Sequence, residues 1–250
     1  MGINYNPFSL EGKNILVTGA SSGIGQAIAI ECSKMGANLV ILGRNEERLT
    51  ETFNLLEGNN HYKIFGELTN DEDIERIAIE CPELDGLVNN AGIGHTSLVR
   101  FIKQQDVEKV FKTNTFAPIL LTKELLKKKK IKKGGSIVFT SSIAAFSNAL
   151  GNSLYSASKS AICAYMRSCA KELADKLIRA NAICPGMVET KLIRGGALSE
   201  DDLQKDMAKY PLKRYGRPEE IAFAAIYLLS DASAWITGTS MVIDGGKLLK

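Results

Sequence analysis

The chain has 250 residues, 45% of them hydrophobic, and this length and composition suffice for one domain with a buried core. Its 31 lysine and arginine residues nearly balance 28 acidic residues, and a formal charge of +3 does not support a nucleic-acid partner. No export signal and no run of about 18 apolar residues occurs, so we expect one cytoplasmic domain over residues 1–250 with no membrane partner.

Short apolar runs alternate with helical patterns along the chain. The predicted strands are residues 13–18, 38–42, 61–65, 84–89, 136–140 and 180–184. One predicted helix follows the glycine- and serine-rich turn after the first strand and ends at residue 35, and further helices are predicted over 46–56, 71–80, 104–126 and 154–177. Residues 218–246 read as a helix followed by a strand. Because the strands are continuously apolar and alternate with helices, we expect a doubly wound, Rossmann-type parallel sheet covered by helices on both faces.

Two segments interrupt this alternation. Residues 127–133 read KKKKIKK, which predicts a solvated helix end whose cations complement the helix dipole. Residues 191–215 are rich in glycine and charge, which predicts an inserted loop or lid.

The five cysteines are odd in number, widely spaced and without the spacing or histidine partners of a zinc site. They predict reduced thiols in the cytoplasm and no metal site. They are Cys32, Cys81, Cys163, Cys169 and Cys184.

Residues 18–25 read TGASSGIG at the point where the first strand meets the first helix. Glycines there let main-chain amides approach a phosphate at the positive end of the helix. The spacing differs from G-x-G-x-x-G, and tight packing of the strand on the helix is the alternative explanation. The order strand, turn, helix favours a dinucleotide site.

Tyr155 and Lys159 are four residues apart in a helical stretch, so both side chains share one face. A neighbouring ammonium group lowers the pKa of a phenol, although this spacing also arises by chance from an exposed tyrosine and a solvated lysine. Ser142 and the Asn-Asn-Ala-Gly segment 89–92 follow two predicted strands, and the carboxyl ends of parallel strands are where such sheets bind ligands.

Seven motifs in this order resemble those of the short-chain dehydrogenase/reductase family, over residues 13–246. They are TGASSGIG at 18–25, NNAG at 89–92, Asn114 in KTNTFAP, Ser142 in SSIAA, YSASK at 155–159, PGMVET at 185–190 and IDGG at 243–246. The resemblance implies a single-domain oxidoreductase that moves a hydride between a nicotinamide cofactor and a carbonyl or secondary alcohol. It includes a general similarity to 3-oxoacyl-acyl-carrier-protein reductases.

The resemblance also implies the catalytic roles. Tyr155 is the general acid and base, and Lys159 lowers its pKa and holds the nicotinamide ribose. Ser142 hydrogen-bonds the substrate oxygen, and Asn114 positions a water in the proton relay. Ser141 competes with Ser142, but the family spacing selects Ser142, and adjacent strand residues point to opposite faces.

The cofactor residues follow from the same motifs. The main chain of Val188 and the hydroxyl of Thr190 are expected to hold the nicotinamide carboxamide and a phosphate, and Leu68 is expected to pack on the adenine ring. The full predicted set is Gly19, Ser21, Ser22, Ile24, Gly25, Arg44, Leu68, Asn90, Tyr155, Lys159, Val188 and Thr190.

The end of the second predicted strand bears on the cofactor. A carboxylate there would bind the ribose hydroxyls and repel a 2′-phosphate, but this sequence has Gly43 followed by Arg44. Arg44, with Ser22, therefore favours NADP(H) over NAD(H). The alternative is that Arg44 is neutralised by the acidic residues of segment 44–48. Glu67 stands where the family commonly has an aspartate that contacts the adenine amino group.

The substrate cannot be read from the sequence. In the family it is selected by the loop at 191–210 and by residues after Ser142, here Ala144, Phe146 and Leu150. His95 either lines the substrate pocket or has a structural or surface role.

The resemblance implies a homotetramer, or a dimer, that packs through residues 218–246. Two other functions stay open: a non-catalytic or regulatory NADP-binding protein on the same fold, and an epimerase or dehydratase without net cofactor turnover.

Overall fold

The computed structural model describes residues 5–147, 149–190 and 200–249. Its seven strands form one sheet in the order β3-β2-β1-β4-β5-β6-β7, and each neighbouring pair is parallel. The strands are β1 (Asn14–Thr18), β2 (Asn38–Gly43), β3 (Tyr62–Phe65), β4 (Leu84–Asn89), β5 (Ile131–Thr140), β6 (Arg179–Pro185) and β7 (Ser240–Ile243). The strand order reverses between β1 and β4, which is where ligands bind in open sheets of this type.

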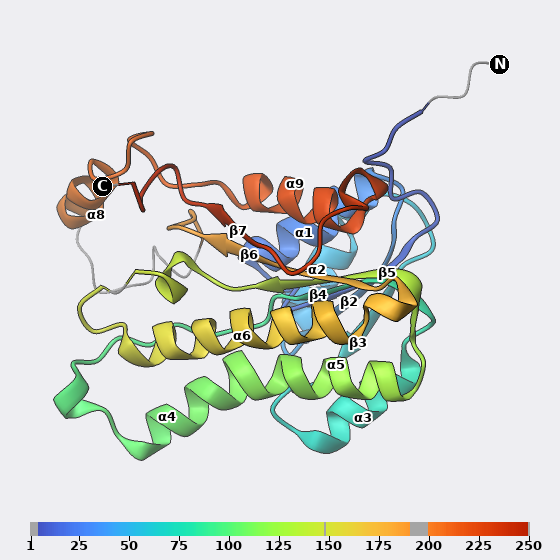
Figure 1. Ribbon diagram of the computed structural model, residues 1–250, viewed down its shortest axis with the longest axis horizontal. Helices are drawn as coiled ribbons and strands as arrows, with labels where there is room; N and C mark the ends of the chain where they lie inside the picture. Colours follow the sequence, from blue (N-terminus) through green and yellow to red (C-terminus); the bar gives the residue numbers. More distant parts are fainter. Residues whose placement is uncertain (1–4, 148, 191–199, 250) are drawn as a thin grey trace.

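Helices cover both faces of the sheet (Figure 1). One core lies between the sheet and α1, α2 and α9, and a second lies between the sheet and α3, α5 and α6. The helices are α1 (Gly23–Lys34), α2 (Glu46–Phe53), α3 (Asp71–Glu80), α4 (Gln104–Phe111), α5 (Ala117–Lys127), α6 (Ser153–Glu172), α8 (Glu200–Met207) and α9 (Pro218–Leu229). The predicted doubly wound parallel sheet is confirmed.

The central strands are buried on both faces, as their continuous apolar sequences require. In β2, every residue after Asn38 is buried, and in β1 the same holds after Asn14. Each fully buried leucine, isoleucine or valine of these strands contributes about 1.5–3 kcal/mol to folding. The strand ends are thereby held in fixed register, which fixes the positions of the loops that follow them.

The predicted helix over 104–126 is divided in the structure. A π-helical turn, Lys112–Phe116, joins α4 to α5 and contains Asn114. Such turns insert one extra residue into an α-helix and occur frequently at functional sites. The spacing of apolar residues in the sequence over 104–126 does not reveal this inserted residue.

The prediction of a solvated helix end over 127–133 is wrong for its second half. α5 ends and β5 begins within this segment, so the strand starts five residues earlier than predicted. Lys130 Nζ donates to two main-chain carbonyls at the end of α3, at 2.6 and 3.0 Å, and Lys132 pairs with Asp85 at 2.9 Å. These contacts fasten the start of β5 to its neighbours.

The predicted loop or lid over 191–215 contains α8, while residues 191–199 lie outside the described residues. The Tyr215 hydroxyl donates to Asp206 Oδ2 at 3.1 Å, which fixes the end of α8 to the segment before α9.

The five cysteines are buried, unpaired thiols. No helix within the described ranges is long and apolar enough to cross a membrane. The same residues contain no group of three histidine, cysteine, aspartate or glutamate side chains arranged to hold a metal.

Candidate active site

The turn between β1 and α1 brings main-chain atoms close together. Gly19 has φ of +65°, and a Cβ there would lie 2.9 Å from Ala91 Cα. A Cβ on Gly25 would collide with the carbonyl oxygen of Gly19 and the side-chain amide of Asn90. Every residue in the first turn of α1 is among the described residues, and none of them is acidic. The Ser22 side chain makes no hydrogen bond that caps this helix. Its amides are therefore available to an anion at the positive end of the helix.

Thr18 joins this turn to the Asn-Asn-Ala-Gly segment after β4. Its hydroxyl oxygen accepts from the main-chain amides of Asn90 and Ala91, at 2.9 and 3.0 Å. Asn90 Nδ2 in turn donates to the Thr18 carbonyl at 3.1 Å. The two loops therefore form one rigid unit. The sequence contains Thr18 as the first letter of the glycine motif, but this role follows only from the adjacency of β1 and β4.

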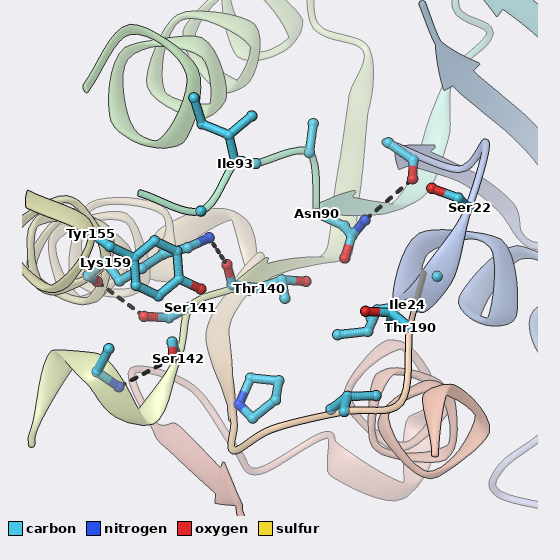
Figure 2. Close-up of a pocket in the computed structure, with 18 of the residues that line it drawn as sticks. Ser22, Ile24, Asn90, Ile93, Thr140, Ser141, Ser142, Tyr155, Lys159 and Thr190 are labelled. Atoms are coloured by element: carbon cyan, nitrogen blue, oxygen red, sulfur yellow. Dashed lines mark hydrogen bonds between the residues drawn. The ribbon is translucent and has the colours of Figure 1, made fainter. Parts of the chain in front are cut away.

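Tyr155 and Lys159 lie on one face of α6 and point into the same end of the pocket (Figure 2). Lys159 is 5% exposed, and its Nζ lies 5.8 Å from the centroid of the Tyr155 ring. Lys159 Nζ donates to the carbonyl oxygen of Thr140 at 2.8 Å. Thr140 is the last residue of β5, so the sheet fixes the position of the ammonium group.

Ser142 and Ser141 follow β5 and play different parts. The Ser142 hydroxyl oxygen accepts from Ala144 N at 3.1 Å, at the start of the 3-10 helix Ile143–Ala145, which leaves its O–H to donate. Ser141 Oγ donates to the carbonyl oxygen of Lys159 at 3.0 Å and accepts from Cys163 Sγ at 3.2 Å. Ser141 thus supports α6 locally.

Burial is the main cause of the pKa shifts of Tyr155 and Lys159 at this end of the pocket. Burial raises the pKa of Tyr155, and the hydrogen bond with Ser142 only partly opposes it. Burial also lowers the pKa of Lys159 to about 8. The sequence predicted a phenol pKa lowered by Lys159, whereas the net shift of Tyr155 in the structure is upward, because burial disfavours the phenolate.

Asn114 clamps the loop after β4 to α6. Its Oδ1 accepts from Ile93 N at 2.8 Å, and its Nδ2 donates to Ile93 O at 2.9 Å and Ser158 Oγ at 3.1 Å. Ser158 is the fourth residue of the YSASK motif, which is the one sequence signal for this contact. The role of Asn114 in positioning a water stays a prediction.

The predicted site residues line one cavity of about 820 Å³, with the exceptions of Gly25 and Asn114. In Figure 2, Tyr155, Lys159 and Ser142 lie at one end of the pocket and Ser22, Ile24 and Thr190 at the other. The predicted residues in the lining are Gly19, Ser21, Ser22, Ile24, Arg44, Leu68, Asn90, Ser142, Tyr155, Lys159, Val188 and Thr190.

The segment after β6 closes one side of this cavity. Val188 is buried and pairs with Gly216 in an isolated bridge, and Thr190 Cγ2 lies 3.2 Å from where a Cβ of Gly23 would be. The Tyr210 hydroxyl accepts from Met187 N at 3.1 Å and so anchors this segment. Tyr210 lines the cavity but was not among the predicted site residues, because only the fold brings it beside Met187.

Arg44 pairs with a residue that neither the favoured interpretation, a 2′-phosphate, nor its alternative, the acidic residues of segment 44–48, had named. Its NH1 lies 3.0 Å from Glu67 Oε2, on the neighbouring strand's loop, rather than beside the acidic residues of segment 44–48. Both side chains line the cavity.

His95 does not belong to this lining. Its Nε2 lies 3.8 Å from Asp106 Oδ2, and its side chain is largely buried. The structural alternative for His95 therefore agrees with the geometry.

Comparison with known proteins agrees with this architecture. A family model described as enoyl-(acyl carrier protein) reductase matches residues 19–247. The chain is 37% identical over 240 residues to the 3-oxoacyl-(acyl-carrier-protein) reductase FabG of Rickettsia felis, covering 96% of this chain and 98% of that protein.

Solved structures are also similar. A structure described as a short-chain alcohol dehydrogenase from Sinorhizobium meliloti superposes with a TM-score of 0.89 at 31% identity, covering 97% of this chain and 99% of the other. One assigned as an NAD(P)-dependent gluconate 5-dehydrogenase from Beutenbergia cavernae, with NADP bound at low occupancy, gives a TM-score of 0.89 at 29% identity, covering 98% and 100%.

The family match spans most of the chain, and the fold and the curated relatives agree with it. The chain belongs to the short-chain dehydrogenase/reductase family and is an oxidoreductase acting on CH–OH or C=O groups.

Proposed function

We propose that this protein transfers a hydride between NADP(H) and a carbonyl or secondary alcohol, with Tyr155 as the general acid and base. The observation that carries the proposal is the convergence of Tyr155, Ser142 and Lys159 at one end of a cavity whose other end is a glycine turn at a helix N-terminus. When bound, the nicotinamide supplies or accepts the hydride.

The three side chains divide the remaining work. The hydroxyl group of Ser142, which lies beside Tyr155, orients the substrate oxygen. Tyr155 donates its proton to the alkoxide that forms during reduction, and its raised pKa keeps the phenol protonated at neutral pH. Lys159 places a cation beside Tyr155, stabilises the phenolate left after proton transfer and holds the nicotinamide ribose. Asn114 keeps the loop after β4 in place and positions a water.

The residues of the other end fit a dinucleotide. The turn at Gly19 and Gly25 has no room for a Cβ, so main-chain amides can contact a diphosphate directly. We assign Ser21 and Ile24 to this diphosphate region. We assign the adenine side to Leu68 and Asn90, the nicotinamide side to Val188 and Thr190, and the 2′-phosphate to Arg44 with Ser22. The structural relative with bound NADP supports NADP(H) over NAD(H).

The proposed substrate is a carbonyl compound or a secondary alcohol. The relatives are described with different substrates, an acyl-carrier-protein thioester and gluconate. We propose that residues 200–215, the described part of the predicted lid, cover the substrate in this single domain, because Asp206, Lys209 and Tyr210 line the cavity.

We further propose a homotetramer, or a dimer, that packs through the C-terminal segment. Trp235 is 99% exposed, and Phe223 and Val242 are also exposed on this segment. An apolar surface of this kind suits contact with a second copy of the chain.

The five unpaired thiols suit the reducing conditions of the cytoplasm, where we propose that the protein is located.

A cofactor-oxidation screen tests the proposal. The protein is incubated with NADPH or NADH and panels of acyl thioesters, keto-sugars, steroids and quinones, and the loss of absorbance of the reduced nicotinamide is followed. We expect turnover with at least one carbonyl compound and a higher kcat/KM with NADPH. Tight NADPH binding without turnover on any panel would instead support the non-catalytic alternative.

A further inference from the structure

Arg44 and Glu67 meet because their strands are neighbours. β2 and β3 pair in parallel with Gly43 opposite Phe65, so the residues just beyond both strands lie at the same edge of the sheet. Gly66 N donates to Gly43 O at 3.3 Å and extends this pairing by one residue. The fold therefore places a carboxylate beside the guanidinium group that we assign to the 2′-phosphate.

The Glu67 carboxylate is held on both oxygens. Oε2 accepts from Arg44 NH1 at 3.0 Å, and Oε1 accepts from Thr69 N at 3.1 Å. The main-chain N–H of Glu67 donates to Asp73 Oδ2 at 2.8 Å. Burial opposes ionisation, but the hydrogen bonds from Arg44 and Thr69 outweigh it and lower the pKa of Glu67. The carboxylate is therefore charged at neutral pH and fixed in place.

This pair differs from an ordinary surface ion pair by its position. Both side chains line the same cavity as the glycine turn, together with Asn45 and Arg48. A 2′-phosphate at this end would need the donors of Arg44, one of which already serves a carboxylate. A ribose without that phosphate leaves the pair intact.

We infer that Glu67 sets the discrimination between NADP(H) and NAD(H) by competing with the 2′-phosphate for Arg44. This inference rests on the proposed function. It makes Glu67 a specificity-determining residue that lowers the preference for NADP(H) below what Arg44 alone would give, because its carboxylate holds one donor of the guanidinium group and offsets part of its positive charge.

The test is direct binding of NADP⁺, NAD⁺ and 2′,5′-ADP, measured by titration calorimetry without turnover. The variant is Glu67→Gln, whose amide oxygen can still accept from Thr69 N. The matched control is Glu47→Gln, which removes the same charge from an exposed residue of α2 outside the cavity lining. An unchanged melting temperature shows that each variant is folded.

We expect Glu67→Gln to bind NADP⁺ and 2′,5′-ADP about fivefold more tightly, and NAD⁺ within about twofold of the unaltered protein. Glu47→Gln should change none of the three affinities by more than about twofold. Unchanged or weaker NADP⁺ binding in Glu67→Gln would overturn the inference.

The Arg44→Gln variant distinguishes competition between Glu67 and the 2′-phosphate for Arg44 from direct repulsion of the phosphate by the Glu67 carboxylate. The Arg44→Gln variant has no guanidinium group at this position for Glu67 to bind. Adding Glu67→Gln to it should therefore give no further gain in NADP⁺ affinity. An equal gain in this background would show direct repulsion of the phosphate and overturn the inference, while leaving the proposed function intact. If the unaltered protein bound neither nicotinamide cofactor, the proposed function itself would fail.

Discussion

Lys159 Nζ lies 5.8 Å from the centroid of the Tyr155 ring and donates to the Thr140 carbonyl at 2.8 Å. Lys159 is buried and Tyr155 is partly buried, and burial raises the pKa of Tyr155 while it lowers the pKa of Lys159. The buried pair therefore favours a protonated phenol beside an easily deprotonated amine. The consequences can be measured in kinetics and in stability.

The pH dependence of alcohol oxidation reports on Tyr155. Oxidation requires the phenolate as base, and the pKa of Tyr155 lies above the ordinary value of about 10. We expect kcat/KM for oxidation to rise throughout the range from pH 7 to 10. A plateau beginning near neutral pH would show that Lys159 lowers the phenol pKa more than burial raises it.

Replacement of Lys159 by methionine should change how stability depends on pH. The folded protein holds this proton with a pKa of about 8, against an ordinary value of 10.5, so the unfolded chain binds more protons between these values. The cost of burying the ammonium is therefore present in full below pH 8 and is relieved as pH rises to 10.5.

Between pH 7.5 and 10 the unaltered protein should gain about 2 kcal/mol of unfolding free energy relative to Lys159→Met. Urea unfolding at the two pH values measures this difference. Equal pH dependence of both proteins would contradict the assigned shift of Lys159.

Asn114 should contribute to stability through its clamp on Ile93. Asn114→Ala leaves the main-chain amide and carbonyl of Ile93 without this partner, at a cost of about 1–3 kcal/mol. Ser158→Ala removes only one of the three bonds and should cost about 1 kcal/mol. Equal losses in denaturant unfolding would show that the clamp does not act through Ile93.

Gly25→Ala should weaken NADPH binding because the turn has no room for the added Cβ. The methyl group collides with the Gly19 carbonyl and Asn90, so the turn must shift, at a cost of about 1–3 kcal/mol in stability. At Gly216 an added Cβ meets its neighbours no closer than 3.7 Å, so Gly216→Ala serves as the control for stability. Equal melting temperatures for the two variants would contradict the described turn.

Assembly through the C-terminal segment predicts a signal from the single tryptophan of the chain. Trp235 is 99% exposed in one copy, so its fluorescence should shift to shorter wavelength when copies associate. Trp235→Asp should lower the molar mass measured by light scattering. An unchanged mass would place the contact between copies elsewhere.

The fold and the proposed catalytic set could be predicted from the sequence because they rest on local patterns. The strand β2 is a single apolar run, and Tyr155 and Lys159 are linked by the helical period. The resemblance of ordered motifs then placed Ser142 and Asn114 in the same site.

Other features depend on contacts between distant segments, which no local pattern contains. Glu67 meets Arg44 only through the pairing of β2 with β3, and Tyr210 meets Met187 only because the segment after α8 lies against the segment after β6. The upward shift of Tyr155 likewise depends on burial by the whole fold, which spacing to Lys159 does not reveal.

The most direct test of the central claim is single-turnover and steady-state kinetics of Tyr155→Phe with a carbonyl substrate from the screen, alongside NADPH binding. The variant lacks only the hydroxyl, so we predict a fall in kcat of about 10²–10⁴-fold with an NADPH Kd within about twofold of the unaltered protein. Turnover at the unaltered rate would contradict the assignment of Tyr155 as the proton donor.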